Sequence, residues 1–420
     1  YEVKTDIIEV SSKHTNYEEC DKFMKELMPV VKDKKITPRD YQVQSFVECV
    51  KRERALLLSP TSSGKSLVIY SLIRWHQQFL DNDKILILVP TTNLVTQMYN
   101  DFKDYSSQTT WNVDDQCHMI YSGREKDSEK QIYISTWQSL FRLGVPYFKK
   151  FGMVIGDEAH NFKAKSLTAI MEKCVNAEYR IGTTGTLDGT QTHQLVLEGL
   201  FGPVHKVTTT KELMDSNDLA KLDIQILLLK YKDEYCQVVS KLKYADELDF
   251  IVRYEPRNNF ISNLACDLKG NTLILFQFVE KHGKPLHDIL KKKVSKDRKL
   301  FYVSGETDVD TRENIRAITE KEENAIIVAS IGTFSTGINI KNLHNIVFAS
   351  PSKSRIRNLQ SIGRGLRLGD NKINAALYDI ADDLTYKSKE NFTLKHFQER
   401  INIYTEEEFD YEIHNIQLKE

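Results

Sequence analysis

The amino-acid sequence predicts an α/β protein with two doubly wound, parallel-sheet domains in tandem. Two observations support this prediction. Short apolar runs, which suit strands buried on both faces of a parallel sheet, recur in two stretches of the chain. Amphipathic stretches of helical length separate these runs. We expect a short N-terminal appendage or linker over 1–36, the domains over 37–207 and 266–386, a connection over 208–265 and a helical tail over 387–420.

Each expected domain contains five apolar runs. In the first domain the runs lie at 55–58, 85–89, 132–135, 153–156 and 179–182, and helices are expected between them, for example over 67–80 and 93–102. In the second domain the runs lie at 272–276, 300–303, 325–329, 345–349 and 375–380. The stretch 208–265 has one further candidate strand, at 224–229, among polar segments that favour helix. We therefore interpret 208–265 as the link between the domains.

The overall composition narrows the function classes. Of the 420 residues 40% are hydrophobic, enough for more than one buried core. The formal net charge is −1, so any nucleic-acid site must come from local groups rather than from a positive field over the whole molecule. The six cysteines lack the spacing of a metal or redox site, which favours reduced thiols and a cytoplasmic protein. No apolar run approaches the ~18 residues of a membrane span, so no membrane partner is expected. Because the chain begins with Tyr1, a further N-terminal segment could precede it.

A phosphate-binding loop is predicted directly after the first expected strand. Residues 59–66 read Ser-Pro-Thr-Ser-Ser-Gly-Lys-Ser, which fits GxxxxGK[ST] except that Ser59 replaces the first glycine. Small residues let backbone N–H groups surround phosphate at the positive end of the following helix. Lys65 would bind the β- and γ-phosphates, and the Ser66 hydroxyl would ligate Mg²⁺. The other expected nucleotide contacts in this loop are Thr61, Ser62, Ser63 and Gly64. The alternative is a small-residue turn before an ordinary helix.

The tetrapeptide Asp157-Glu-Ala-His160 follows the strand expected at 153–156. A carboxylate at the end of a strand beside the phosphate loop suits the Mg²⁺ shell, so Asp157 is the expected second metal ligand. Glu158 is expected to orient or deprotonate the attacking water. His160 is expected to couple the nucleotide site to the other domain, although it could also be an ordinary polar turn residue. Together with the loop at 59–66, this motif predicts an NTPase.

The second domain contains the pattern QxxGRxxR, formed by Gln360, Arg364 and Arg367. Residues three apart share a helix face, so the two guanidinium groups can point the same way. They would neutralise charge that develops on the transferred phosphate, as an arginine finger does. The alternative is a solvated basic helix face.

In this combination of motifs the chain resembles the superfamily 2 helicases, over roughly residues 36–385. That resemblance implies two RecA-like domains that use ATP and Mg²⁺. It implies adenine recognition by Arg39 and Gln42 of RDYQ, and a nucleotide contact at Gly337 of SIGTFSTG. It also implies coupling of hydrolysis to movement through Thr184 and Thr186 of TGT. The residues that it implies for holding a nucleic-acid backbone are Thr91, Thr92, Thr136, Trp137, Ser304, Gly305 and Thr333.

Three stretches bring the chain nearest to the phage UvsW-type branch-migration helicases. They are VPTTNLVTQM, FSTGINIKNLH and the tail from Phe397 through Tyr404 to Phe409. This resemblance implies an ATP-dependent DNA helicase or translocase that remodels forks, four-way junctions and R-loops in recombination, repair and replication. The implied partners are forked, branched or single-stranded DNA, an RNA–DNA hybrid, and recombination or replication proteins. For a phage protein the expected location is the host cytoplasm.

Several alternatives stay open at this stage. The threonine and serine hydroxyls could cap helices, and Trp137 could belong to the core instead of stacking on a base. The basic residues over 281–299 favour a solvated helix face over a duplex contact. Three other functions compete with the DNA helicase: an RNA helicase, a nucleic-acid-binding scaffold with an inactive ATPase, and the motor subunit of a restriction complex.

Overall fold

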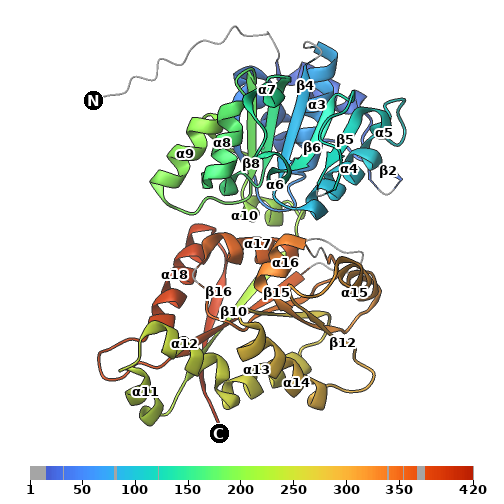
Figure 1. The fold of residues 1–420 in the computed structure, drawn as a ribbon. Coiled ribbons are helices and arrows are strands. Elements are labelled where there is room, and N and C mark those ends of the chain that lie inside the picture. Colours follow the sequence, from blue (N-terminus) through green and yellow to red (C-terminus); the bar gives the residue numbers. More distant parts are fainter. Residues whose placement is uncertain are drawn as a thin grey trace, which may run out of the picture. The chain divides into compact units, whose positions relative to one another are not determined.

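The computed structural model describes residues 16–31, 33–79, 83–121, 123–337, 340–352, 354–366 and 374–419. The chain divides into two compact units, Tyr1–Thr208 and Thr209–Glu420, each built around one parallel sheet (Figure 1). Within the described residues, no helix is both long enough and apolar enough to cross a bilayer. All six cysteines are free thiols, and five of them are buried.

The first unit has a seven-stranded sheet in the order β5-β6-β4-β7-β8-β3-β9, with parallel pairing throughout. Its strands are β3 (Arg54–Leu58), β4 (Lys84–Val89), β5 (Cys117–Ile120), β6 (Ile132–Thr136), β7 (Phe151–Asp157), β8 (Tyr179–Thr184) and β9 (Val204–Lys206). Its helices are α1 (Tyr17–Glu26), α2 (Asp40–Arg52), α3 (Lys65–Phe79), α4 (Thr92–Ser106), α5 (Val113–Gln116), α6 (Trp137–Leu140), α7 (Val145–Phe148), η1 (Ala159–Lys163), α8 (Lys165–Lys173) and α9 (Gln191–Phe201). A small antiparallel ribbon pairs β1 (Val30–Val31) with β2 (Lys34–Lys35).

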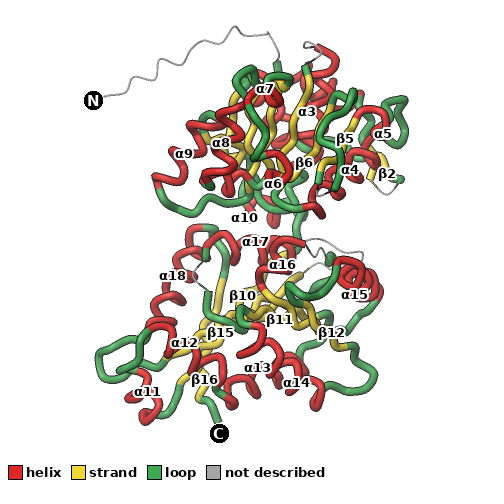
Figure 2. The backbone as a smooth tube through the Cα atoms, in the orientation of Figure 1, coloured by secondary structure: helices red, strands yellow, loops and turns green. Residues whose placement is uncertain are grey.

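Alternate residues of β4 show that this sheet is buried on both faces. Ile85 and Ile87 belong to one apolar core, whereas Leu86 and Leu88 belong to the core on the opposite face. Successive strand side chains point to opposite faces, so an unbroken apolar run is what such a strand requires. Helices cover both faces of the strands (Figure 2). This pattern explains why apolar runs alone located the central strands.

The second unit has a seven-stranded sheet in the order β12-β13-β11-β14-β15-β10-β16, again with parallel pairing throughout. Its strands are β10 (Lys221–Lys230), β11 (Thr272–Phe276), β12 (Leu300–Val303), β13 (Ile326–Ser330), β14 (Asn345–Phe348), β15 (Asn374–Asp383) and β16 (Tyr411–Gln417). Its helices are α10 (Thr210–Asp215), α11 (Asp233–Val239), α12 (Tyr244–Arg253), α13 (Glu255–Asp267), η2 (Val279–Gly283), α14 (Lys284–Lys293), α15 (Val309–Lys321), α16 (Ile331–Gly337), α17 (Arg355–Gly365) and α18 (Phe392–Glu406).

The two sheets have the same topology. When the seven strands of each unit are numbered along the chain, both sheets have the spatial order 3-4-2-5-6-1-7. The first strand of each unit, β3 or β10, therefore lies between the sixth and the seventh. The chain is a tandem of two RecA-like α/β units, as the sequence predicts.

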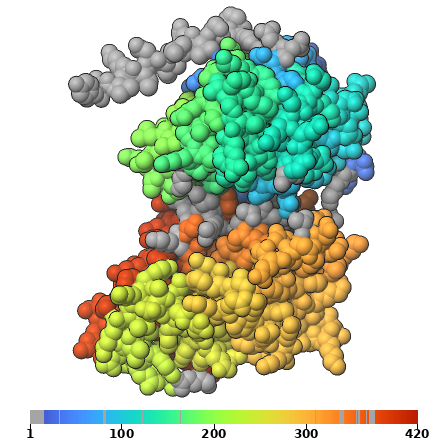
Figure 3. Space-filling view, in the orientation of Figure 1, coloured from blue at the N-terminus to red at the C-terminus, as the bar shows by residue number. Residues whose placement is uncertain are grey.

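The stretch 208–265 does more than link the two sheets. Its strand β10 pairs with β15 along ten residues and with β16 along seven, so it lies inside the second sheet. The following helices α11, α12 and α13 also belong to the second unit, and in Figure 3 this segment forms a broad yellow-green part of that unit's surface. The interpretation of 208–265 as a connection is thus wrong, because its single apolar run is an interior strand and its polar segments are amphipathic helices.

The two ends of the chain also depart from the expected pattern. In the N-terminal appendage, α1 buries Cys20, Phe23 and Met24 in the core of the first unit, so residues 17–26 are part of that unit. The tail is helical only in part. After α18 the chain forms β16, an edge strand whose Tyr411 and Ile416 are half-buried and whose other side chains are exposed. An edge strand that alternates little in polarity carries no clear apolar run.

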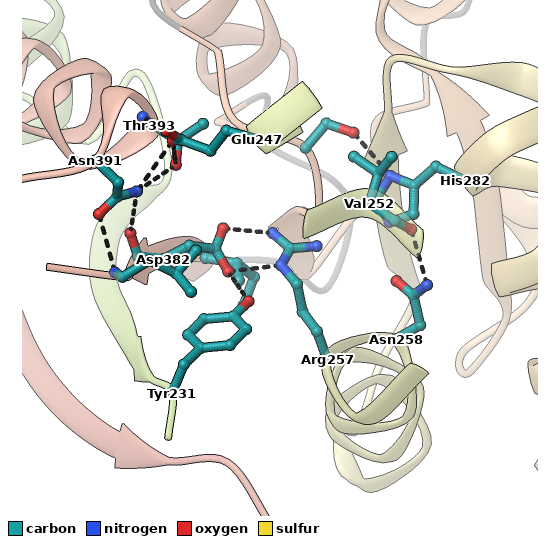
Figure 4. Close-up of polar contacts among 12 residues, drawn as sticks. Tyr231, Glu247, Val252, Arg257, Asn258, His282, Asp382, Asn391 and Thr393 are labelled. Atoms are coloured by element: carbon teal, nitrogen blue, oxygen red, sulfur yellow. Dashed lines mark hydrogen bonds and ion pairs between the residues drawn. The ribbon is translucent and has the colours of Figure 1, made fainter. Parts of the chain in front are cut away.

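A buried polar network ties the helices of the second unit to its sheet (Figure 4). The fully buried Arg257 of α13 donates two hydrogen bonds to Asp382 of β15, from Nε at 2.7 Å and Nη2 at 3.0 Å. Tyr231 donates to the same carboxylate at 2.7 Å. Glu247 of α12 accepts from the backbone N–H groups of Phe392 and Thr393, and so caps α18. Buried charges must be paired in this way, because an unpaired charge would cost several kcal/mol, of the order of 3–5.

Candidate functional site

The phosphate loop at 59–66 connects the end of β3 to the start of α3. Two of its residues have left-handed backbone conformations, Ser62 with φ 73° and Gly64 with φ 82°. A Cβ atom on Gly64 would lie 2.3 Å from Nε2 of Gln42, so a side chain cannot be accommodated there without moving Gln42. Glycine at 64 therefore serves both the turn and the close approach of α2.

Ser59 stands where the phosphate-loop pattern has its first glycine, and it takes part in bonding within the loop. Its hydroxyl lies 2.5 Å from the Ser63 hydroxyl, which is also 2.8 Å from the carbonyl of Pro60. Its backbone N–H donates to the carbonyl of Thr184 on β8 at 2.8 Å. The Lys65 ammonium donates to the carbonyl of Ser59 at 3.3 Å. The departure from the pattern is thus compatible with a closed, internally bonded loop.

Residues of α2 brace the loop from outside. Gln42 is buried and donates from Nε2 to the carbonyl of Ser63 at 2.8 Å, while its Oε1 accepts from the backbone N–H of Arg39 at 2.9 Å. The hydroxyl of Tyr41 donates to the same Ser63 carbonyl at 3.1 Å. Arg39 in turn donates to the Tyr41 hydroxyl at 2.8 Å. The two residues expected to recognise adenine are therefore adjacent to the loop, and Tyr41 is a loop contact that the sequence did not single out.

Strand order brings the second acidic motif next to the loop. Strands β7, β8 and β3 are neighbours, so Asp157, Thr184 and Ser59 all lie at the carboxyl edge of the sheet, where ligands bind in open α/β sheets. Asp157 is buried and accepts a 2.7 Å hydrogen bond from the hydroxyl of Thr183, its register partner on β8. Burial, with a smaller contribution from Glu158, raises the pKa of the Asp157 carboxyl, and Lys65 opposes that rise.

The hydrogen bonds around His160 fix its tautomer. The Thr184 hydroxyl donates to the carbonyl of Thr186 at 3.0 Å, so its oxygen must accept from His160 Nδ1, 2.9 Å away. Nε2 of His160 then accepts from the side-chain amide of Asn161 at 3.1 Å. Nδ1 also lies 3.4 Å from Glu158, whose backbone is left-handed with φ 52°. The three residues expected to couple hydrolysis to movement, His160, Thr184 and Thr186, thus form one bonded cluster.

A second histidine, absent from the sequence-based candidates, holds this cluster from α9. Nε2 of His193 donates to the carbonyl of His160 at 3.0 Å. Nδ1 of His193 lies 2.9 Å from a carboxylate oxygen of Asp188 and 3.2 Å from the Asp188 backbone N–H. His193 is buried and ties the turn after β7 to the loop after β8. No motif spacing marks it, because its role depends on how α9 packs.

The expected metal ligands have the chemistry that Mg²⁺ requires. Ser66 offers a hydroxyl oxygen and Asp157 a carboxylate, both hard oxygen ligands beside the positively charged Lys65. Burial makes the charged form of the Asp157 carboxyl costly, and a nearby cation would favour that charged form. The Ser66 hydroxyl lies 2.8 Å from the hydroxyl of Tyr105 on α4.

The candidate nucleic-acid contacts of the first unit follow β4 and β6. Thr91 is the N-cap of α4, and its hydroxyl accepts from the backbone N–H of Leu94 at 3.4 Å. Thr92 is exposed. Thr136 is buried, with its hydroxyl 3.0 Å from that of Ser139. Trp137 is half-buried against the core, in edge contact with Phe141. Capping and packing therefore account for the Thr91 hydroxyl and much of the Trp137 ring, and Thr92 is the more accessible group.

The candidates of the second unit lie after the carboxyl ends of β12 and β13, on α16, and on α17, which follows β14. Ser304 is buried at a turn where Arg312 donates to the carbonyl of Gly305 at 3.2 Å. Thr333 in α16 accepts a 2.7 Å hydrogen bond from the hydroxyl of Ser330. The remaining candidates are Gly337, the last residue of α16, and two residues of α17, Gln360 and Arg364. The Arg364 side chain and the whole of Arg367 lie outside the described residues.

Comparison with known proteins gives family matches in both units. Residues 35–189 match the family model of the res subunit of type III restriction enzymes, and residues 257–369 match the helicase conserved C-terminal domain. The chain is 34% identical to the ATP-dependent DNA helicase uvsW of Enterobacteria phage T4, over 95% of this chain and 81% of that protein. It is 25% identical to the DNA 3'-5' translocase XPB2 of Sulfurisphaera tokodaii, over 81% of each.

Among solved structures, the ATP-dependent type ISP restriction-modification enzyme LlaBIII bound to DNA matches with a TM-score of 0.66 and 16% identity, over 92% of this chain and 32% of that one. At this identity the match supports the fold alone. The identity to uvsW extends over nearly the whole chain, and the two helicase-type family matches follow in order. The chain therefore belongs to the ATP-hydrolysing superfamily 2 helicases, in the family of the T4 uvsW helicase.

Proposed function

We propose that this ATP-dependent helicase acts on DNA, and that it unwinds or branch-migrates forked and junction DNA in recombination, repair and replication. The observation that supports this proposal most is the 34% identity to the T4 uvsW DNA helicase over 95% of the chain. The shared carboxyl edge of Lys65, Asp157 and Thr184 supports the ATPase part of it.

In the proposed mechanism, Lys65 and the backbone of 61–64 bind the phosphates of ATP, and Arg39 and Gln42 hold the adenine. Ser66 and Asp157 would hold Mg²⁺, which would offset the negative charge of the phosphates. Glu158 follows Asp157 directly and orients the attacking water. Closed bonding of the loop through Gln42 and Ser63 supports this mechanism, since a pre-formed loop loses little entropy on binding.

The bonded cluster of His160, Thr184 and Thr186 supports a route from hydrolysis to movement. A change at Glu158 reaches Thr184 through the imidazole of His160, and reaches Asp188 through His193. Gln360, Arg364 and Arg367 of the second unit are proposed to act on the same ATP, with the two arginines stabilising transition-state charge. Backbone and hydroxyl contacts at Thr92, Ser304 and Thr333 would hold phosphates without reading sequence, as the track of a motor requires.

The test is the steady-state ATPase rate with no nucleic acid, single-stranded DNA, duplex, forked DNA, four-way DNA, RNA and an RNA–DNA hybrid. Lys65→Ala is the inactive control. We expect branched DNA to stimulate most, with no activity in the control, followed by strand separation on forks and migration of four-way junctions. Stimulation by RNA alone would support the RNA helicase instead, and stimulation by RNA–DNA hybrids alone would make R-loop unwinding the main activity. If ATP is hydrolysed with none of these substrates, the result would support a nucleic-acid-binding scaffold with an inactive ATPase instead.

A further inference from the structure

The hydroxyl of Ser66 lies 2.8 Å from the hydroxyl of Tyr105, which belongs to a different element. Tyr105 lies in the last turns of α4, and only 7% of it is exposed. A tyrosine phenol, whose ordinary pKa is about 10, is protonated and neutral at physiological pH. Its ring is held by the aromatic residues of the core, with the Tyr70 centroid 5.5 Å away. The Tyr105 oxygen is therefore a fixed, neutral hydrogen-bonding group beside Ser66.

A neutral serine hydroxyl that ligates a metal keeps its proton, and this proton must point away from the metal. The hydroxyl has one donor and two lone pairs, so an acceptor on the side away from the metal favours the orientation in which a lone pair faces the metal. Groups that accept from a metal ligand orient it, and their loss typically weakens metal binding about 10–100-fold. At 2.8 Å the Tyr105 oxygen can accept the Ser66 proton without any movement of the backbone.

We propose that Tyr105 is a positioning residue for the Ser66 hydroxyl, holding its lone pair toward the divalent cation of the nucleotide site. The inference rests on the proposed role of Ser66 as a metal ligand. Nothing in the phosphate-loop pattern points to Tyr105, which is 39 residues away along the chain. The bond makes the metal affinity of the loop depend on α4, the helix whose N-terminus is capped by the candidate nucleic-acid contact Thr91.

The chain offers a matched control. Tyr70 lies in the same aromatic cluster and is fully buried, but its hydroxyl accepts from Arg74 at 2.8 Å rather than lying at Ser66. Tyr70→Phe and Tyr105→Phe therefore each remove one phenolic oxygen from the same aromatic cluster. Each keeps the ring, and each loses one hydrogen bond worth about 1 kcal/mol.

The experiment measures binding of a fluorescent, non-hydrolysable ATP analogue to the full chain as Mg²⁺ is titrated, and separately in EDTA. For Tyr105→Phe we expect the half-saturating Mg²⁺ concentration to rise about 10-fold or more, with unchanged affinity in EDTA. For Tyr70→Phe we expect wild-type values in both measurements. Binding of Mn²⁺ followed by its electron spin resonance signal provides a second readout that does not need activity.

Two results would overturn the inference. One is a Mg²⁺ dependence of Tyr105→Phe that matches Tyr70→Phe. The other is a loss of affinity in EDTA as large as the loss with Mg²⁺, which would mean that Tyr105 only supports the shape of the loop. Ser66→Ala separates this failure from failure of the proposed function. If Ser66→Ala weakens Mg²⁺ binding and Tyr105→Phe does not, only the positioning role is wrong. If Ser66→Ala has no effect, the assignment of Ser66 as a ligand is wrong.

Discussion

Asp157 is a buried carboxyl group that accepts a hydrogen bond from the neutral hydroxyl of Thr183. Burial raises its pKa in the folded protein above the ordinary value of 3.8, and Lys65 compensates only in part. A carboxyl whose folded pKa is raised binds its proton more tightly in the folded state than in the unfolded state. Its contribution to stability is therefore full below the unfolded pKa and is lost as the pH rises through the folded pKa.

The raised pKa of folded Asp157 predicts how Asp157→Asn changes the stability of the protein. Without a divalent cation, the amide removes the cost of ionising a buried group, while its oxygen can still accept from Thr183. We expect the unfolding temperature in EDTA at neutral pH to rise by roughly 2–4 °C, for a gain of about 1 kcal/mol, and ATP hydrolysis to be lost. Differential scanning calorimetry from acid to neutral pH measures the unfolding temperature. The control is Asp115→Asn, which changes an exposed carboxyl group of α5. A fall in unfolding temperature at neutral pH would contradict the proposed origin of the shift.

Sequence motifs identified the residues of the site that follow strand ends, and the family resemblance added Arg39 and Gln42 at the start of α2. They did not single out Tyr41, Tyr105 or His193. These residues contact the phosphate loop, or the turn at 157–160, from α2, α4 and α9. The packing of a helix on a sheet decides which of its residues meets a given turn, and no local pattern encodes that meeting. For the same reason Thr91 and Trp137 were ambiguous from sequence, and the structure shows capping and packing at both.

At the level of elements, apolar runs located strands that are buried on both faces. The run at 272–276 coincides with β11, and the one at 85–89 misses a single residue of β4. The pattern failed at three edge strands, β5, β9 and β16, whereas at the fourth edge strand, β12, the run at 300–303 coincides with the strand. Strand β9 has only three residues, and β16 is mostly exposed. β10 was recognised as a candidate strand but assigned to a link, because its partners β15 and β16 lie about 150–190 residues further along the chain.

The position of β10 predicts which fragment of the chain folds. Residues 209–420 contain all seven strands of the second sheet, whereas 266–386 lack β10 and β16 and expose one full edge of β15. That fragment also loses Tyr231 and Arg257, so Asp382 would be left as a buried, unpaired charge. We expect cooperative unfolding and dispersed amide NMR signals from 209–420, and neither from 266–386. Cooperative unfolding of the shorter fragment would restore 208–265 as a link.

On the scale of the whole molecule, the common strand order allows the two units to be compared position by position. In the first unit, β3 is followed by the phosphate loop, and β7 ends at Asp157 and is followed by Glu158. In the second unit, β10 takes the place of β3 and β14 that of β7. Residues 231–232 after β10 contain no glycine and lead into α11, and residues 349–352 after β14 read Ala-Ser-Pro-Ser and contain no carboxylate.

These differences predict one nucleotide site per chain. The first turn of α11 carries Asp233 and Glu234, whose negative charges oppose phosphate at the only helix N-terminus that follows β10 directly in the described structure. Lys230 at the end of β10 is paired with Asp383, and Ser350 after β14 is bonded to His282, so both groups are engaged within the second unit. Both units thus have the strand order that can carry a phosphate site. Among the described residues, the groups that such a site needs are found in the first unit.

Equilibrium binding of a non-hydrolysable ATP analogue with Mg²⁺ should therefore saturate at one molecule per chain. Lys65→Ala should remove that binding, because Lys65 belongs to the single loop able to surround the phosphates. Isothermal titration calorimetry gives the stoichiometry directly, and the fragment 209–420 provides an independent arm that should bind no analogue. Two molecules per chain, or residual binding in Lys65→Ala that persists in the fragment, would mean that the second unit holds a nucleotide through residues other than a strand-to-helix loop. One molecule per chain leaves the second unit free to act on ATP only through its side chains, as proposed for Arg364.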